Sequence, residues 1–116
     1  MHPEIVVFGS AIVDFISYVN RLPKSGETLH GTKFATGFGG KGANQCVAAA
    51  KLGAKTAMIG KLGKDTWGQK YLGNLQSQGV ETSGVKQVDD TTGIAQIIVS
   101  ESGENQIVIV AGAIII

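Results

Sequence analysis

Residues 37–44 read Gly-Phe-Gly-Gly-Lys-Gly-Ala-Asn, a glycine-rich run in a chain of 116 residues. It leads into Ala43–Leu52, which is rich in helix formers and is followed by Gly53, a residue favoured just past a helix end. The sequence therefore predicts a glycine loop that opens a helix. Glycines let the backbone approach a ligand, and a helix start offers free N–H groups to polar oxygens. Lys41 adds a positive charge, and Asn44 offers both a hydrogen-bond donor and an acceptor. This set of groups suits a ligand that is rich in hydroxyls or carries phosphate.

Two familiar nucleotide-binding patterns fit this loop poorly. Gly37, Gly39 and Gly42 satisfy the dinucleotide pattern G-x-G-x-x-G, but residues 30–36 make a poor buried strand and no acidic residue ends the next strand. A P-loop needs Ser or Thr after its lysine, and here Gly42 follows Lys41. A glycine-rich turn without any ligand remains open on composition alone.

The pattern of strands and helices predicts an α/β fold. Ile5–Phe8 and Thr56–Gly60 are short apolar runs typical of strands buried on both faces, and a helix is expected from Asp65 or Thr66 to about Gln78. Helical spacing in this segment favours a core position over a ligand site for Trp67, Tyr71, Leu72 and Leu75. Strands that alternate with helices indicate a parallel sheet flanked by helices.

Further strands indicate a smaller second sheet. Residues 15–19 and 28–36 form extended pieces, the latter with an exposed face. Residues 92–100 and 106–111 are β-rich and separated by a polar turn, which predicts a hairpin.

Composition excludes several function classes. Apolar residues make up 43% and charged residues 16%, and the net charge is +1 with scattered basic residues, so we expect neither a nucleic-acid nor a membrane partner. The longest apolar run, Ile107–Ile116, is far shorter than the roughly 18 residues needed to span a bilayer. The single cysteine, Cys46, allows no intrachain disulfide and fits a reducing compartment, and the N-terminus does not resemble a signal peptide. We therefore expect a cytoplasmic location. The apolar last residues have no polar cap, which predicts a fold that is cut short.

Asp14 is the second candidate for chemistry. It follows the first strand, and ligands of open α/β sheets gather at the carboxyl ends of strands. A carboxylate there can accept two hydrogen bonds from neighbouring hydroxyl groups, although a lone aspartate can equally be a turn or capping residue.

Several motifs occur together in a fixed order, and the ordered set resembles the ribokinase (PfkB-type) family of carbohydrate kinases over essentially the whole chain. The motifs are Ile5–Asp14 with its Gly-Ser before the aspartate, Gly26-Glu27-Thr28, Phe38–Gln45, Leu62-Gly63-Lys64-Asp65-x-x-Gly68, Thr92-Gly93 and Gly103-Glu104-Asn105.

The resemblance implies a ribokinase-like three-layer α/β fold, a helix-flanked and mainly parallel sheet, with a small β-sheet lid. Residues 1–116 would be the truncated N-terminal sugar-binding part, with lid strands in about 11–36 and 92–111 and the C-terminal ATP-binding half absent. The substrate-binding residues that it implies are Ile12, Val13, Asp14, Gly40, Lys41, Gly42, Ala43, Asn44, Ala95 and Ile97.

The activity implied is ATP-dependent phosphorylation of D-ribose to ribose 5-phosphate, with Mg²⁺ and a monovalent cation such as K⁺ as cofactors. The family's catalytic base lies in a late Gly-Ala-Gly-Asp motif, so no catalytic residue, no metal ligand and no cofactor-binding residue is expected in this chain. The lid would pair two subunits into a homodimer.

The sequence departs from the family at two positions. Ribokinases often have Asn where this chain has Ile12, which leaves open a related kinase for fructose or a nucleoside. Ile114 also replaces a usual Asn. A third possibility is a catalytically inactive fragment that binds sugar or dimerises.

Overall fold

The computed structural model describes residues 2–114 of the chain. Its elements, in chain order, are β1 (Ile5–Phe8), β2 (Ile12–Val19), β3 (Lys33–Gly39), α1 (Lys41–Lys51), β4 (Thr56–Gly63), α2 (Thr66–Ser77), β5 (Glu81–Val88), β6 (Ile94–Ser100), β7 (Asn105–Val110) and a 3₁₀ turn (Gly112–Ile114).

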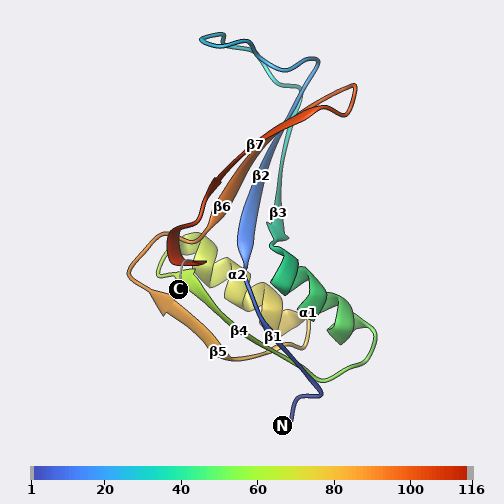
Figure 1. Cartoon of the computed structure of the whole chain (residues 1–116), viewed down its shortest axis with the longest axis vertical. Helices are drawn as coiled ribbons and strands as arrows, with labels where there is room; N and C mark the ends of the chain where they lie inside the picture. Colours follow the sequence, from blue (N-terminus) through green and yellow to red (C-terminus); the bar gives the residue numbers. More distant parts are fainter. Residues whose placement is uncertain (1, 115–116) are drawn as a thin grey trace.

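The strands form two separate sheets (Figure 1). A parallel sheet has the order β1-β4-β5, and together with α1 and α2 it makes up what we call the base. A second sheet, with the order β3-β2-β6-β7, rises from the base and is called here the projecting sheet. The molecule is accordingly long and thin, 51 × 32 × 19 Å.

Both helices cover the same face of the base sheet. Alternate residues of β4, among them Met58 and Leu62, are buried on this face. They form one core cluster with Cys46 of α1 and with Tyr71 and Leu75 of α2. The spacing that predicted apolar packing for α2 is therefore confirmed, and Cys46 is a buried core residue.

The opposite face of the base sheet is uncovered. Val6 is 54% exposed and Phe8 66% exposed, and the register places Phe8 beside the exposed Ile59. The prediction that β1 is buried on both faces is therefore wrong for the described residues, because the helices cover only the side that carries Val7.

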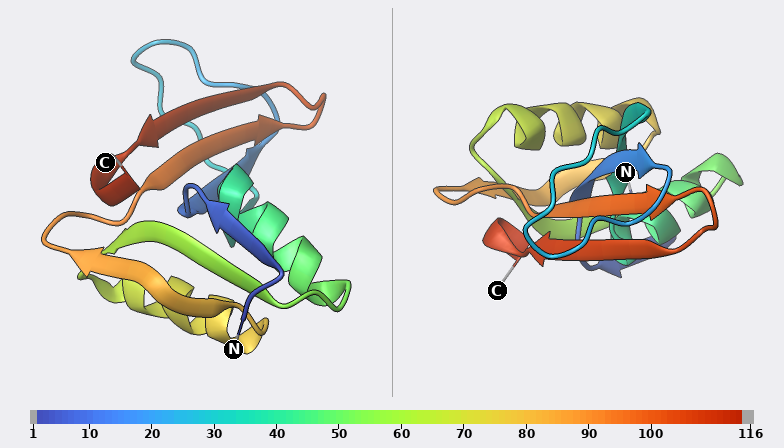
Figure 2. Two further views of the ribbon diagram at one scale, coloured as in Figure 1. Left: turned by 60° about the horizontal axis from the view of Figure 1, so that its bottom comes forward. Right: turned by 90° about the horizontal axis from the view of Figure 1, so that it is seen from above.

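The projecting sheet combines both kinds of strand pairing. β2 pairs with β3 antiparallel and with β6 parallel, and β6 pairs with β7 as the predicted hairpin. The views in Figure 2 show the segment between β2 and β3 reaching beyond the end of this sheet.

The structure corrects the predicted boundaries in three places. β3 begins at Lys33 and continues to Gly39, so half of the predicted glycine loop is strand. Asp14 lies inside β2 and not in a turn after β1. The strand β5 was not predicted at all.

Candidate functional site

Asp14 lies where three strands of the projecting sheet run side by side. Its register partners are Gly37 on β3 and Ala95 on β6. Successive residues of a strand point to opposite faces, so Ile12 shares the face of Asp14 whereas Val13 points the other way. Val13 is fully buried, and its N–H donates to the carbonyl of Gly93 (2.9 Å).

The carboxylate of Asp14 lies across Gly39. A Cβ atom placed on Gly39 would be 2.5 Å from Oδ2 of Asp14, so only a residue without a side chain leaves room for this carboxylate. Partial burial raises the pKa of Asp14 above its ordinary value. No hydrogen bond within residues 2–114 uses the Asp14 carboxylate oxygens, which leaves both as acceptors for a ligand.

Gly40 turns the chain from β3 into α1. Its φ is 98°, a value that favours glycine, and an added Cβ would be 2.5 Å from the carbonyl oxygen of Ser10. The same carbonyl accepts the N–H of Ala43 (3.1 Å), so the loop is fixed against the segment between β1 and β2. Within the described chain no side chain caps α1, and because the N–H of Ala43 is bonded to Ser10, the N–H groups of Lys41 and Gly42 are the ones open to a ligand.

The other expected site residues divide into two groups. Ala95, which is 5% exposed, and Ile97 belong to the β6 face that adjoins Asp14 and Ile16. Lys41 is exposed at the start of α1. Asn44 is also exposed but lines a groove between the two helices, together with Phe38, Val47, Ala48, Lys51, Tyr71, Asn74 and Gln78.

Tyr71 is a site residue that the sequence pattern assigned only to the core. It is 1% exposed, and its hydroxyl donates to the carbonyl of Gly39. Burial first, and then the negative charge of Asp14, raise the pKa of Tyr71 far above its ordinary value. The sequence contains one signal for this polar role, because a tyrosine among buried helix positions needs a hydrogen-bond partner for its hydroxyl.

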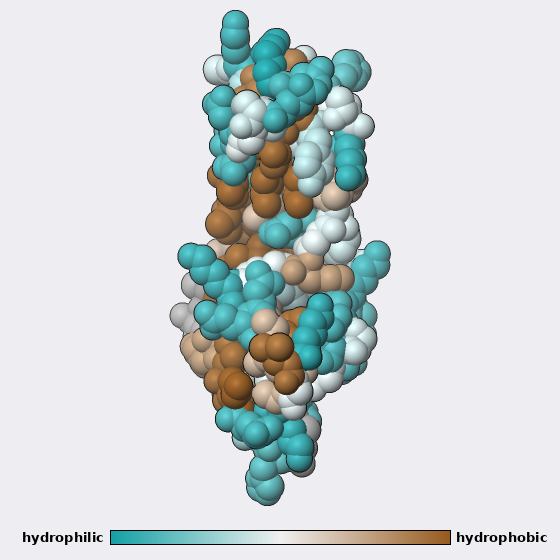
Figure 3. Space-filling view, turned by 90° about the vertical axis from the view of Figure 1, so that its right-hand side faces the viewer, coloured by the Kyte–Doolittle hydropathy of each residue, from teal (hydrophilic) through white to brown (hydrophobic). Residues whose placement is uncertain are grey.

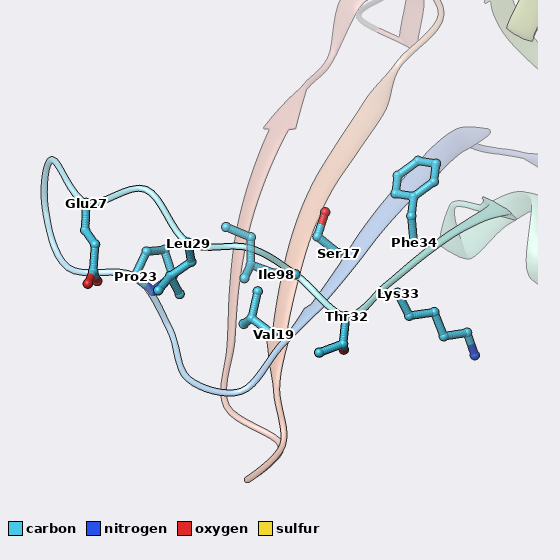
Figure 4. A pocket seen from close by; sticks show the side chains of 10 residues that line it. Ser17, Val19, Pro23, Glu27, Leu29, Thr32, Lys33, Phe34 and Ile98 are labelled. Carbon is cyan, nitrogen blue, oxygen red and sulfur yellow. The ribbon is translucent and has the colours of Figure 1, made fainter.

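A separate pocket lies at the far end of the projecting sheet (Figure 4). It is lined by Ser17 and Val19 of β2, which strand alternation places on the face opposite Asp14. Strand residues such as Ser17 and Ile98 face Pro23 and Leu29 of the segment between β2 and β3 there. None of the expected site residues lines this pocket. In the same segment the Arg21 guanidinium binds the Glu27 carboxylate through two hydrogen bonds (2.7 and 2.6 Å), which lower the pKa of Glu27 to about 2.

Residues 2–114 contain no group of three or more His, Cys, Asp or Glu side chains that could hold a metal ion. None of the helices in this part of the chain is long and apolar enough to cross a membrane.

This chain is similar to known carbohydrate kinases. Residues 2–114 match the pfkB family carbohydrate kinase model. The chain is 54% identical to mouse ribokinase over 110 residues, which are 94% of this chain and 34% of the relative. It is 47% identical to a Salmonella typhi deoxyribokinase over 111 residues, 95% of this chain and 36% of that protein.

The fold agrees with this relationship. Arabidopsis thaliana ribokinase, solved as a complex with ribose and ATP, superimposes with a TM-score of 0.85 at 39% identity, over 97% of this chain and 37% of that structure. The ribokinase-like α/β fold is thereby confirmed for the part of it that this chain covers. The chain spans about a third of the length of the curated relatives it matches. On the family model and these relatives together, the chain belongs to the pfkB family of carbohydrate kinases.

Proposed function

We propose that this chain supplies the sugar site of a ribokinase-type kinase, which transfers phosphate from ATP to the 5-hydroxyl of D-ribose. The observation that carries the proposal is the Asp14 carboxylate, which lies across Gly39 beside the open start of α1. The relatives support the choice of reaction, because one is a ribokinase at 54% identity and another was solved with ribose and ATP.

Each group near Asp14 has a part in holding the sugar. The carboxylate accepts hydrogen bonds from two neighbouring hydroxyls, and the first N–H groups of α1 donate to sugar oxygens. Lys41 adds a charged donor, and Asn44 is assigned to the sugar with its loop. Ala95 and Ile97 pack against the carbon skeleton.

The reaction itself needs groups beyond these residues. The oxygen of the 5-hydroxyl attacks the terminal phosphorus of ATP, the bond to the ADP oxygen breaks, and the hydroxyl proton passes to a base. We assign the base, the ATP pocket and the Mg²⁺ and K⁺ sites to the part of the fold that the relatives have in addition. Phosphoryl transfer depends on positioning, on charge stabilisation and on a placed base, so this chain by itself is expected to position the sugar only.

The domain assignment follows from this division. Residues 1–116 form the sugar-binding part, and the projecting sheet is the lid that excludes water from the sugar. We propose that the lid also pairs two subunits, since β7 leaves Ile107 and Val108 51% and 62% exposed. The proposed setting is the cytoplasm, whose reducing conditions suit the unpaired Cys46.

A second substrate is favoured by one residue. Ile12 shares the face of Asp14 and its side chain cannot form a hydrogen bond, so a sugar hydroxyl beside it would have no partner from this residue. A deoxyribose-type substrate therefore competes with ribose, in line with the 47% identity to a deoxyribokinase. Fructose and nucleosides are the remaining acceptors to test.

The test is a sugar panel in a complete kinase. We define the mouse chimera as mouse ribokinase in which this chain replaces the segment to which it aligns. ADP release is measured with ATP, Mg²⁺, K⁺ and ribose, deoxyribose, fructose or adenosine. Ribose is expected to give the highest kcat/KM. Failure of every sugar would contradict the proposed function.

The matched control is the 116-residue chain alone in the same assay. We expect no ADP release above the blank without protein. Turnover by the chain alone would show that it contains a base and an ATP site, against the proposed division of the fold.

A further inference from the structure

Tyr71 joins α2 to the point where the projecting sheet meets α1. Its hydroxyl donates to the carbonyl of Gly39, the last residue of β3, across 32 positions of sequence. Gly40 follows with its positive φ, and α1 begins at Lys41. Tyr71 of the base is thus hydrogen-bonded to Gly39, the residue at which β3 ends and the turn into α1 begins.

Asp14 and Tyr71 both adjoin Gly39. The Asp14 carboxylate occupies the space where a Gly39 side chain would lie. Tyr71 binds the carbonyl of the same residue. Any movement of Gly39 therefore changes the position of the α1 start relative to the carboxylate that faces it.

The ring and the hydroxyl of Tyr71 have separable effects. The ring packs edge-on against Phe38 with a centroid distance of 4.9 Å and belongs to the core cluster of the base. That packing contributes to stability whether or not the hydroxyl is present. The hydroxyl contributes one directed bond to Gly39, and replacing Tyr71 by phenylalanine removes that bond alone.

We propose that Tyr71 is a positioning residue for the sugar site: through the Gly39 carbonyl it fixes the spacing between the Asp14 carboxylate and the first N–H groups of α1. Tyr71 does not touch the sugar itself. Its effect on sugar binding rests on the proposed function, whereas its effect on the loop does not.

The first experiment is hydrogen–deuterium exchange on the 116-residue chain. The amides of Ala43 and Asn44 report the loop, because they donate to the carbonyls of Ser10 (3.1 Å) and Gly40 (2.9 Å). In Tyr71→Phe these two amides are expected to exchange up to about tenfold faster, as for the loss of one neutral hydrogen bond, while amides in the pairing of β2 with β6 are unchanged. Equal acceleration throughout the chain, or none at the loop, would overturn the proposal.

A matched control is Tyr18→Phe. Tyr18 lies on β2, where its ring is 5.3 Å from the Lys33 ammonium group, and it belongs to no part of the site. This variant is expected to leave the exchange of Ala43 and Asn44 at the wild-type rate. Faster exchange in both tyrosine variants would assign the effect to general loosening and would also overturn the proposal.

The second experiment measures kinetics in the mouse chimera. Tyr71→Phe is expected to raise KM for the sugar about 2- to 10-fold, as for the loss of one neutral hydrogen bond. The KM for ATP is expected to stay the same, and kcat to change less than about twofold. An unchanged sugar KM in an active chimera overturns the proposal. An inactive parent chimera contradicts the proposed function instead, and the exchange result then decides the role of Tyr71.

Discussion

At the scale of single residues, Asp14 is held with its carboxylate partly removed from water and without a hydrogen-bond donor among residues 2–114. An ionised group in that position is less stable than in the unfolded chain, which is why its pKa is raised. Such an arrangement is typical of groups retained for a ligand, because it does nothing to stabilise the fold.

Asp14→Asn is expected to leave the fold at least as stable as the wild type at neutral pH. The raised pKa means that the charged form is penalised in the folded state above that pKa, and the penalty disappears as the pH falls below the ordinary value of 3.8. Any gain in stability of the variant should therefore shrink toward acid pH. Urea unfolding followed by the fluorescence of Trp67 measures this. A clear loss of stability at pH 7 would show that Asp14 has a structural partner.

The role of Lys41 can be separated from that of Lys51, the other lysine of α1. Lys41→Met in the mouse chimera is expected to lower kcat/KM for ribose at least about tenfold, since a hydrogen bond to a charged group contributes about 1.5–3 kcal/mol. The matched control is Lys51→Met at the other end of the same helix, which should leave the kinetics unchanged. If the two variants behave alike, Lys41 is a solvated turn residue.

At the scale of elements, the start of α2 is hydrogen-bonded to the segment that leads into β6. Oδ1 of Asp65 accepts the N–H of Gly68 (2.8 Å) and the hydroxyl of Thr92 (2.6 Å), and Oδ2 accepts the N–H of Thr92 (2.8 Å). Burial alone would raise the pKa of Asp65, but the hydrogen bonds from Thr92 and Gly68 hold it below the ordinary value. The carboxylate that caps α2 therefore also holds Thr92, just before β6 of the projecting sheet begins.

Two Asp65 variants distinguish the cap from the connection to Thr92. Asp65→Asn keeps an acceptor for Gly68 but loses the bond from the Thr92 N–H, at a cost of about 1.5–3 kcal/mol in unfolding free energy. Asp65→Ala also removes the helix cap, and its unfolding free energy is expected to be lower by about a further 0.5–2 kcal/mol. Trp67 fluorescence during urea unfolding measures both, since this ring meets Phe15 of the projecting sheet at 5.1 Å.

The pH dependence of stability shows whether ionised Asp65 stabilises or destabilises the fold. Because its pKa is lowered, Asp65 stabilises the fold above the ordinary value of 3.8, and this contribution is lost as the pH falls through the lowered folded pKa. The wild type and Asp65→Asn should therefore converge in stability at acid pH. Equal stability of all three proteins at pH 7 would contradict the role of Asp65.

Elements that depend on neighbouring residues in the sequence could be predicted, whereas elements that depend on pairing with a distant strand could not. The start of α2 could be predicted because Asp65 is a good N-cap, and the β6–β7 hairpin because of its polar turn. The extension of β3 to Gly39 could not, because it depends on pairing with β2, whose Asp14 needs the space above a glycine. β5 was missed because its sequence is largely polar and its pairing with β4 stabilises it.

The residues of the candidate site likewise include some that could be predicted from the sequence and one that could not. Asp14, Gly40 and Lys41 could be named from their motifs, and the structure places them at one junction. Tyr71 could only be assigned to the core, because its bond to Gly39 spans 32 residues.

At the scale of the whole molecule, two apolar surfaces are not covered by any part of residues 2–114. One is the outer face of the base sheet, with Val6 and Phe8 exposed. The other belongs to the projecting sheet, where Figure 3 shows a band of apolar side chains. The strand β7 has Ile107, Val108, Ile109 and Val110 each 49–62% exposed. Exposed apolar strands of this kind favour association.

The isolated chain is therefore expected to associate with itself at micromolar concentration. Val108→Lys should weaken this association, because it places a charge on the exposed strand. Leu52→Lys is the matched control, since Leu52 is 89% exposed but follows α1, away from both surfaces. Light scattering and sedimentation measure the effect. A monomeric wild type with one sharp cooperative melt would show that these surfaces need no cover.

The measurement that tests the central claim most directly is kcat/KM for D-ribose in the mouse chimera, compared between the parent and its Asp14→Asn variant. The amide loses the charge and one acceptor oxygen, so kcat/KM is expected to fall about 10- to 150-fold, as for the loss of a hydrogen bond to a charged group. The KM for ATP should stay the same, because Asp14 is assigned to the sugar alone. Ribose kinetics close to those of the parent would contradict the assignment of Asp14 and with it the proposed sugar site.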